Sequence, residues 1–350
     1  MSTEPFTING ITVKPGTRTT IDLPAGRLYT HAPMTIPVHI VAGKRSGPCL
    51  FLSAAIHGDE INGVEIIRRV LKLPVLKRLK GTVLAVPIVN VHGLISHSRY
   101  LPDRRDLNRS FPGSEKGSLA ARLAHLFMTE IVAKSTHGID LHTGAIHRSN
   151  LPQIRANLDD DETNRMAMAF QAPVIISSNL RDGSLRESAS EFGIPTLLYE
   201  AGEALRFDEV GIRAGVKGIV NVMRLLGMLP ATRAKSKTQT EPVVARSSSW
   251  VRAPSSGILR AMVPLGGRVK NGTLLGIVAD PFGEKEVEIN ATFSGIIIGR
   301  TNLPLVNEGD ALYHIARFED IKEIEAKVDE FQEEHSPEPI SSPHSESPII

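Results

Sequence analysis

The chain has 350 residues, of which 41% are hydrophobic and 22% charged, and its formal net charge is +2. This length exceeds one average domain, so we expect one large or two unequal domains with a real hydrophobic core. The small net charge and the lack of basic runs argue against DNA or RNA as a partner. A single cysteine, Cys49, rules out a disulfide framework within the chain and fits a reducing compartment.

The N-terminal segment "MSTEPFTING" has neither the basic nor the apolar region of a signal peptide. No apolar run approaches the roughly 20 residues that a membrane span needs. We therefore expect a soluble, cytoplasmic protein that has no membrane partner. Cys49 lies inside an apolar run, which favours a buried structural role over a catalytic thiol. The composition leaves a homo-oligomer open.

Residues 1–47 predict short strands, because "ITVKPGT" and "MTIPVHIVAG" alternate with period two between prolines and glycines. From 48 to 230, apolar strand-like runs alternate with amphipathic helical segments, which predicts an α/β fold with a mixed sheet flanked by helices. Neither a G-x-G-x-x-G after the first strand nor a G-x-x-x-x-G-K-[ST] occurs, so nucleotide binding is disfavoured. We assign 1–230 to one α/β domain.

The C-terminal third differs in composition. Residues 231–247 predict a polar linker, and 248–318 predict a small all-β domain. Within it, "APSSGIL" is echoed by "ATFSGII" and "VKNGTLLGIV" by "VNEGDALYHI", at offsets of 38 and 37 residues. This internal repeat indicates a duplicated β unit forming a sandwich or half-barrel. Residues 319–350 predict an acidic tail that begins with a helix-like stretch and is mostly disordered.

The stretch "FLSAAIHGDEING" ends a buried strand with His57 and Glu60 at positions i and i+3. At a strand-to-helix junction these two side chains can converge, and imidazole and carboxylate are good zinc ligands. Gly58 is expected to provide a sharp bend beside them. The alternative is a solvated turn in which Asp59 or Glu60 caps the following helix.

A second strand ends in "IDLHTG", where Asp140 and His142 are two residues apart and so face the same side. His142 is the favoured third ligand, because a strand directs it and Asp140 can orient its imidazole. His92 and His97, which follow another strand, are the alternatives. A third strand ends in Glu200, whose carboxylate could accept a proton from an activated water; Glu203 is its alternative.

The segment "SRYLPDRRDLNRSFPG" carries four arginines between Arg99 and Arg109, interleaved with apolar side chains. Partial burial of a guanidinium demands an anionic partner, which predicts an anion-binding loop. Asn108 and Arg109 could grip a substrate carboxylate, and another arginine could stabilise an oxyanion. The alternative is a solvated charged loop.

Together, "HGDE", Arg99 with "DLNR", "DLHTG" and "EAGE" resemble the succinylglutamate desuccinylase/aspartoacylase family of zinc carboxypeptidase-like hydrolases over residues 48–230. The duplicated β unit is similar to that family's appended β domain and to biotinyl/lipoyl half-barrels. It lacks the lysine-bearing hairpin of the latter, so we expect no prosthetic group.

The resemblance implies one Zn²⁺ per chain, held by His57, Glu60 and His142, with Asp140 supporting the ligands. It implies Glu200 as the general base, Asn108 and Arg109 as a carboxylate clamp, and Arg99 as the oxyanion-side arginine. Arg104 and Arg105 are alternatives for that last role, because the loop is about two residues longer than in aspartoacylase-like members. Arg155 is assigned to substrate binding, and Arg186 lies in a further segment that resembles the deacylase branch.

These residues predict a zinc-dependent hydrolase that cleaves the amide of an N-acetyl or N-succinyl type amino acid or a related small molecule, with acetyl-diaminobutyrate fitting equally well. One alternative is a metallocarboxypeptidase acting on peptides. The other is a non-catalytic binding protein that retains a vestigial metal site.

Overall fold

The computed structural model describes residues 6–178, 181–231, 242–245, 247–318 and 321–336. Within them, no helix is long and apolar enough to cross a membrane. The helices are α1 Asn62–Lys72, α2 Val91–Ile95, α3 Leu119–Glu130, α4 Asp161–Phe170, α5 Leu185–Glu191, α6 Glu209–Leu225 and α7 Ile321–His335, with short 3-10 turns η1 Pro74–Arg78, η2 Leu107–Arg109 and η3 Val132–Lys134.

The strands of the first 230 residues are β1 Phe6–Ile8, β2 Ile11–Val13, β3 Arg18–Arg27, β4 Pro33–Ala42, β5 Arg45–Ala54, β6 Lys80–Val86, β7 His137–Gly144, β8 Arg148–Ala156, β9 Val174–Ser177 and β10 Thr196–Glu203. The later strands are β11 Val243–Ala245, β12 Ser247–Arg252, β13 Gly257–Ala261, β14 Arg268–Val269, β15 Leu274–Ala279, β16 Glu286–Asn290, β17 Gly295–Thr301, β18 Leu305–Val306 and β19 Ala311–Arg317.

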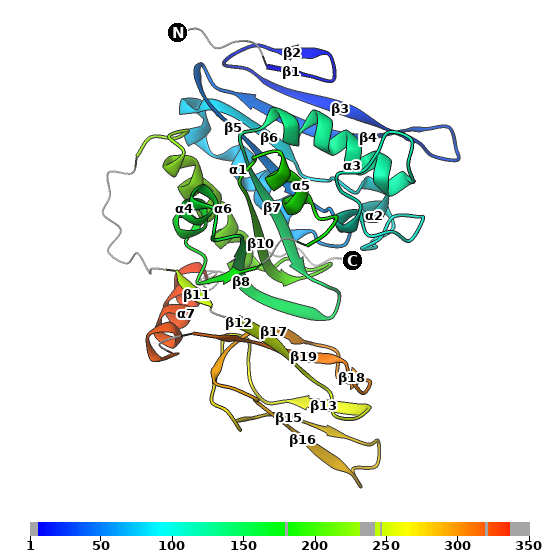
Figure 1. Cartoon of the computed structure of the whole chain (residues 1–350), viewed down its shortest axis with the longest axis vertical. Helices are drawn as coiled ribbons and strands as arrows, with labels where there is room; N and C mark the ends of the chain where they lie inside the picture. Colours follow the sequence, from blue (N-terminus) through cyan, green and yellow to red (C-terminus); the bar gives the residue numbers. More distant parts are fainter. Residues whose placement is uncertain (1–5, 179–180, 232–241, 246, 319–320, 337–350) are drawn as a thin grey trace, which may run out of the picture.

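One large mixed sheet runs through the molecule in the order β12-β19-β17-β8-β10-β7-β5-β6-β4-β3 (Figure 1). Its central strands β6, β5, β7 and β10 are parallel, so their carboxyl ends lie at one edge. Strands β4 and β8 flank this parallel group in antiparallel pairs. The predicted α/β class with a mixed sheet is confirmed.

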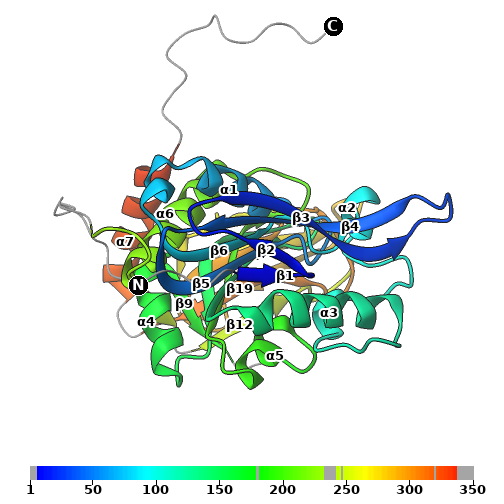
Figure 2. The ribbon, with the colours of Figure 1, turned by 90° about the horizontal axis from the view of Figure 1, so that it is seen from above.

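Helices cover both faces of the sheet because its central strands are apolar on both sides (Figure 2). On β5, Leu50 and Leu52 pack into a core with α1, α4 and α6. The alternate residue Phe51 packs on the opposite face against α3, where its ring meets Phe127 edge-on. Cys49 is buried on that face, and burial raises the pKa of its thiol to about 12. This environment suits a structural thiol.

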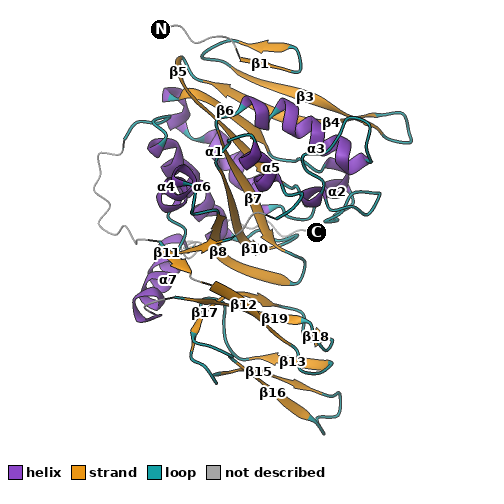
Figure 3. Ribbon diagram, viewed as in Figure 1, coloured by secondary structure: helices purple, strands orange, loops and turns teal. Residues whose placement is uncertain are grey.

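The C-terminal strands form a two-layer unit at the lower end of the molecule (Figure 3). One layer is the four-stranded sheet β16-β15-β13-β18, and the other contains β12, β19, β17 and β14. The repeated segments occupy equivalent places in opposite layers, β13 and β15 from the first copy and β17 and β19 from the second. The predicted strand-rich C-terminal unit is therefore present, and its second layer continues into the main sheet through β17 and β8.

The predicted linker, 231–247, is wrong at its C-terminal end. Val243–Ala245 forms β11, which pairs in parallel with β9, and β12 begins at Ser247. Two β-branched valines beside an available strand edge favour pairing over an open linker. Residues 232–241 of that prediction lie outside the described residues.

The predicted helix-like start of the acidic tail, 319–350, is present. Ile321–His335 forms α7, and its Val328 and Phe331 are buried. Phe331 joins the core beneath α6, and Lys217 of α6 lies 2.6 Å from Glu334. Burial of these apolar side chains orders the segment despite its acidic composition. Residues 337–350 lie outside the described residues.

Candidate metal centre and active site

Three neighbouring parallel strands bring the polar side chains to one edge of the main sheet. His57 and Glu60 follow β5, His142 is on β7, and Glu200 is on β10 directly opposite His142. The carboxyl edge of such a sheet is where open α/β folds place ligands. The apolar cores below hold the strands, so the site stands on rigid elements.

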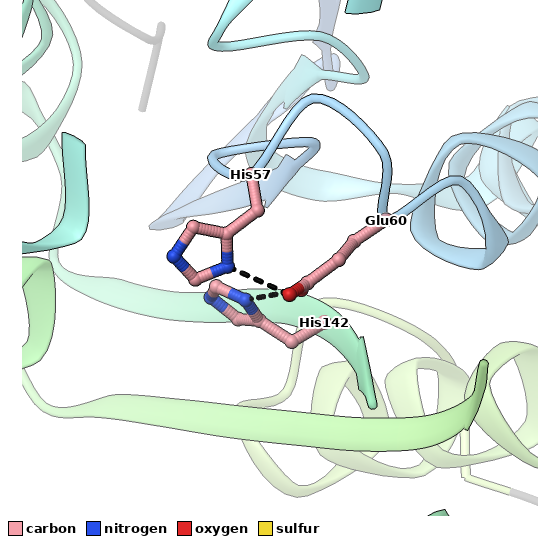
Figure 4. A group of neighbouring side chains, drawn as sticks. All are labelled: His57, Glu60 and His142. Carbon is pink, nitrogen blue, oxygen red and sulfur yellow. Dashed lines mark hydrogen bonds and ion pairs between the residues drawn. The ribbon is translucent and has the colours of Figure 1, made fainter. Parts of the chain in front are cut away.

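His57, Glu60 and His142 converge, as Figure 4 shows. Each imidazole directs Nδ1 at the Glu60 carboxylate, with His57 Nδ1 2.8 Å from Oε1 and His142 Nδ1 2.7 Å from Oε2. Their nearest ligand atoms lie within 4.8 Å of one another, and all three residues are buried. The backbone N–H of Thr143 also donates to Glu60 Oε2 at 3.1 Å.

A carboxylate holds the far nitrogen of each imidazole. His142 Nε2 lies 2.7 Å from Asp140, and His57 Nε2 lies 3.1 Å from Asp106. The Asp140 carboxylate is itself held by the Ser53 hydroxyl at 2.7 Å. Such contacts fix the ring orientation and the tautomer, so that Nδ1 is left facing the centre. Asp140 occupies the expected place beside His142.

The role of Asp106 was missed in the sequence, although this residue opens the "DLNR" motif. Its second carboxylate oxygen accepts a hydrogen bond from Arg99 at 3.0 Å, and Arg99 also lies 3.2 Å from Glu60. The only available signal was the position of an aspartate in the same loop as the arginines. Nothing in the sequence says that it reaches His57, 49 positions earlier.

The electrostatics of the cluster favour a charged carboxylate. Burial alone would raise the pKa of Glu60, but His57 and His142 hold it well below its usual range. Burial likewise opposes the charged form of His142, and Asp140 with Glu60 outweighs it and raises the pKa of the imidazole. The Glu60 carboxylate is a buried anion between two imidazole nitrogens. A divalent cation can bind carboxylate oxygen and imidazole nitrogen together. The three residues therefore fit a metal ion.

The local backbone of "HGDE" contains the expected bend. Gly58 lies in a turn closed by a hydrogen bond from the Glu60 N–H to the His57 carbonyl at 3.0 Å, while the left-handed residue is Ala55, with φ 51°. Gly58 is required because a Cβ there would lie 2.0 Å from the carbonyl carbon of Gly93. Asp59 does not cap α1, whose N-cap is Ile61 without a side-chain bond. Instead Asp59 is buried, and burial followed by Glu60 raises its pKa.

Glu200 faces the same site from β10. Asn150 and Arg155, both on β8, donate to its Oε2 at 3.0 Å each. In the described part of the chain, Oε1 accepts no hydrogen bond, so the carboxylate is held through one oxygen and offers the other. The alternative Glu203 instead binds the backbone N–H of His147 and the Asn302 side chain, away from the site.

The converging side chains line a cavity of about 230 Å³. Arg99, Asn108 and Arg109 line this cavity, and Arg104 and Arg105 do not. Asn108 Oδ1 accepts the backbone N–H of Leu185 at the start of α5. The alternative metal ligands His92 and His97 do not line the cavity either. Other wall residues include Arg148, Arg181, Arg186 and Trp250.

Arg186 and Trp250 illustrate what the sequence did and did not reveal. Arg186 is buried, and burial followed by Arg155 lowers its pKa to about 10. Its position in "RDGSLR" marked it as a candidate without a role. Trp250 gave no signal, because it lies in the β unit that the sequence separates from the α/β domain.

Comparisons with known proteins identify the family and the fold. The family model of the succinylglutamate desuccinylase/aspartoacylase catalytic domain matches residues 46–226. The chain is 29% identical to an N-alpha-acetyl-L-2,4-diaminobutyric acid deacetylase from Halomonas elongata over 292 residues, covering 80% of this chain and 85% of the relative.

Solved structures share the fold. A product-bound ectoine utilization protein from Ruegeria pomeroyi superposes with a TM-score of 0.76 at 24% identity, covering 86% of this chain and 95% of that one. A succinylglutamate desuccinylase/aspartoacylase from Rhodobacter sphaeroides gives 0.77 at 24%, covering 86% and 96%. Because the family model spans more than half of the sequence, the chain belongs to the succinylglutamate desuccinylase/aspartoacylase family.

Proposed function

We propose that the protein is a zinc-dependent deacylase that hydrolyses the amide bond of an N-acetyl or N-succinyl type amino acid. The observation that carries this proposal is the buried His57, Glu60 and His142 cluster facing Glu200 across an arginine-lined cavity. Membership in the family and the likeness to the Halomonas deacetylase support a small N-acylated amino acid as the substrate.

Zinc is the favoured ion because two imidazoles and one carboxylate are a common ligand set of catalytic zinc sites. His57 and His142 would bind through Nδ1, since Asp106 and Asp140 occupy their Nε2 atoms. When bound, the ion supplies a Lewis acid and makes hydroxide available near neutral pH.

Glu200 acts as the general base. In the proposed reaction its carboxylate accepts a proton from the attacking water, whose oxygen bonds to the acyl carbon. The C–N bond then breaks, and Glu200 returns the proton to the departing nitrogen, which gives a carboxylate and a free amine. Asn150 and Arg155 hold its Oε2, so Oε1 is the oxygen positioned for proton transfer.

The clamp for the substrate carboxylate is formed by Asn108 and Arg109, both in the cavity wall. The bond from Leu185 to Asn108 Oδ1 leaves the side-chain NH₂ of Asn108 as a donor. Arg99 is the oxyanion-side arginine, and Asp106 and Glu60 position its guanidinium. Arg155 contacts Glu200, and its role in substrate binding stays a prediction.

A single amino acid fits this cavity better than a peptide does. Trp250, from the C-terminal β unit, forms part of the wall, so a side of the cleft is closed by a second structural unit. This favours the deacylase over a metallocarboxypeptidase, because a peptide substrate needs an open path for its chain.

The test is amine release from a panel of N-acetyl and N-succinyl amino acids and one hexapeptide by the zinc-loaded protein. We expect turnover of a single N-acyl amino acid. Glu200→Gln is expected to keep zinc and lower kcat by about 10²- to 10⁴-fold. Glu203→Gln, the matched control, is expected to retain kcat. Protein that binds no zinc and turns over nothing would favour the binding-protein alternative, and faster cleavage of the hexapeptide would favour the carboxypeptidase.

A further inference from the structure

A row of side chains crosses from the α/β domain into the C-terminal β unit. Asn150 on β8 lies opposite Gly299 on β17, Gly299 opposite His314 on β19, and His314 opposite Trp250 on β12. Directly paired residues point to the same face of a sheet. The joined sheet therefore presents Trp250 on the face where Asn150 holds Glu200.

Gly299 keeps this row compact. A Cβ at that position would lie 2.8 Å from Asn150 Oδ1 and 3.3 Å from the His314 Cβ. The missing side chain lets Asn150 occupy the space between the two units, where it donates to Glu200.

The Trp250 ring contacts both His314 and Arg148. Its ring lies nearly parallel to His314, with centroids 4.6 Å apart and an interplanar angle of 8°. The Arg148 guanidinium carbon lies 5.1 Å from the centroid of the Trp250 ring. Burial, followed by the charge of Arg155, lowers the pKa of His314 to about 3, so its imidazole is neutral at physiological pH. The indole therefore supports one cation, Arg148.

Arg148 lies close to the reacting end of the cavity. It precedes Asn150 by two residues on β8, which is about 7 Å along a strand. Arg148 and Asn150 both line the cavity. Arg148 therefore belongs to the same cavity wall as the proposed base Glu200.

Within the described part of the chain, no carboxylate pairs with Arg148. Among the other cavity arginines, Arg99 and Arg155 are paired with acids, Arg109 belongs to the proposed clamp, and Arg181 is exposed. The three wall carboxylates are engaged as well, Glu60 by the imidazoles, Asp140 by His142 and Glu200 by Arg155. Among the described residues, Arg148 thus has no anionic partner, and its guanidinium lies over an aromatic ring.

We propose that Arg148, supported by Trp250, is a specificity-determining residue that binds a second carboxylate of the substrate. This inference rests on the proposed function, in which Asn108 and Arg109 bind the first. A guanidinium whose face lies on an aromatic ring still has its edge N–H groups available for a carboxylate. The second carboxylate belongs to the acyl group or to the amino acid side chain.

Two matched substrate pairs test the inference. N-acetylglutamate and N-acetylglutamine differ only at the side-chain end, and N-succinylalanine and N-succinamoylalanine differ only at the acyl end. Binding to zinc-loaded Glu200→Gln protein is measured by calorimetry, and turnover is measured with unmodified protein. We expect the carboxylate member of one pair to be favoured by about 10- to 100-fold, the effect of one charged hydrogen-bonding contact.

Arg148→Met is expected to abolish that preference through Kd and KM, with kcat nearly unchanged. Arg148→Lys keeps the charge without the flat stack and is expected to retain only part of the preference, which covers a Met variant that fails to fold. Arg260→Met, an exposed arginine on β13, is the control for the loss of one charge.

The outcomes separate the two proposals. Three results would overturn the role of Arg148 and leave the deacylase proposal intact. These are turnover with equal use of both members of each pair, turnover with a preference that survives Arg148→Met, and turnover with N-acetyl-diaminobutyrate as the best substrate. An Arg148-dependent binding preference without turnover supports Arg148 and overturns the hydrolysis. Absence of both binding and turnover overturns both proposals.

Discussion

At the scale of residues, the candidate metal site depends on paired contacts to each imidazole. One ring nitrogen faces Glu60, and the other is held by Asp106 or Asp140. An imidazole held on one side loses little rotational freedom when it binds an ion on the other, so the supporting carboxylates contribute to metal affinity.

Asp106→Ala tests this contribution. We expect zinc affinity to fall by about 10- to 100-fold, because His57 loses the group that fixes its tautomer and Arg99 loses one of its two acids. Competition with a chromogenic chelator measures the affinity. Asp103→Ala, in the same loop but with its carboxylate paired to Arg105, is the control. Equal zinc affinity in both variants would show that Asp106 does not support the ligand.

At the scale of elements, α1 follows the metal loop directly and is tied to α6. Arg69 of α1 donates to both carboxylate oxygens of Glu209 at 2.7 and 2.9 Å, and also to Glu65 at 2.7 Å. The hydrogen bond from Arg68 is the main cause that lowers the pKa of Glu65 to about 2. The hydrogen bond from Arg69 likewise lowers the pKa of Glu209 to about 2. The network links the helix behind Glu60 to the rest of the domain.

This network predicts a pH dependence of stability. The folded-state pKa values lie below the unfolded value of about 4.3, so the stabilisation is present above that pH and is lost as the pH falls toward 2. Arg69→Met is expected to reduce the rise of the unfolding free energy between pH 2 and 5, measured by urea denaturation. Because the Arg69 and Glu209 side chains are each about a third exposed to solvent, the change is expected to be small.

Arg260→Met serves again as the control for charge, since this exposed side chain lies in the β unit. An unchanged slope after Arg69→Met, with a general loss of stability at all pH values, would show that Arg69 acts by packing rather than through its acids.

At the scale of the whole molecule, the C-terminal β unit is part of the main sheet. β17 pairs with the edge of β8, and a shared apolar cluster joins Leu151, Val174 and Ile176 to residues of β17, β19 and α7. Separation of the two units would expose both an unpaired strand edge and this cluster. Exposed edges of that kind promote association between chains.

A chain ending at Pro230 is therefore expected to aggregate and to lose the wall formed by Trp250. Size-exclusion chromatography and zinc content measure the outcome, with the full chain as the control. A monodisperse, zinc-binding fragment with the selectivity of the full chain would show that the β unit contributes neither to the sheet nor to the substrate site.

The local sequence pattern was sufficient to predict the three strand-end motifs. His57 with Glu60, Asp140 with His142, and Glu200 each lie within or just after an apolar run, and parallel strands bring such ends to one edge. The internal repeat was equally visible, since equivalent strands share a pattern. The predicted site roles remain predictions, but the structure brings these side chains together.

The sequence by itself determined the α/β class, the ligand-type residues and the duplicated β unit, because each depends on patterns within a few tens of residues. Only the tertiary structure decided that Asp106 holds His57, that Arg155 holds Glu200 and that Trp250 reaches the cavity. These contacts join residues 45 or more positions apart and depend on strand register and on the pairing of β17 with β8. Strand register across a sheet is set by packing of the whole molecule, and a local pattern carries no record of it.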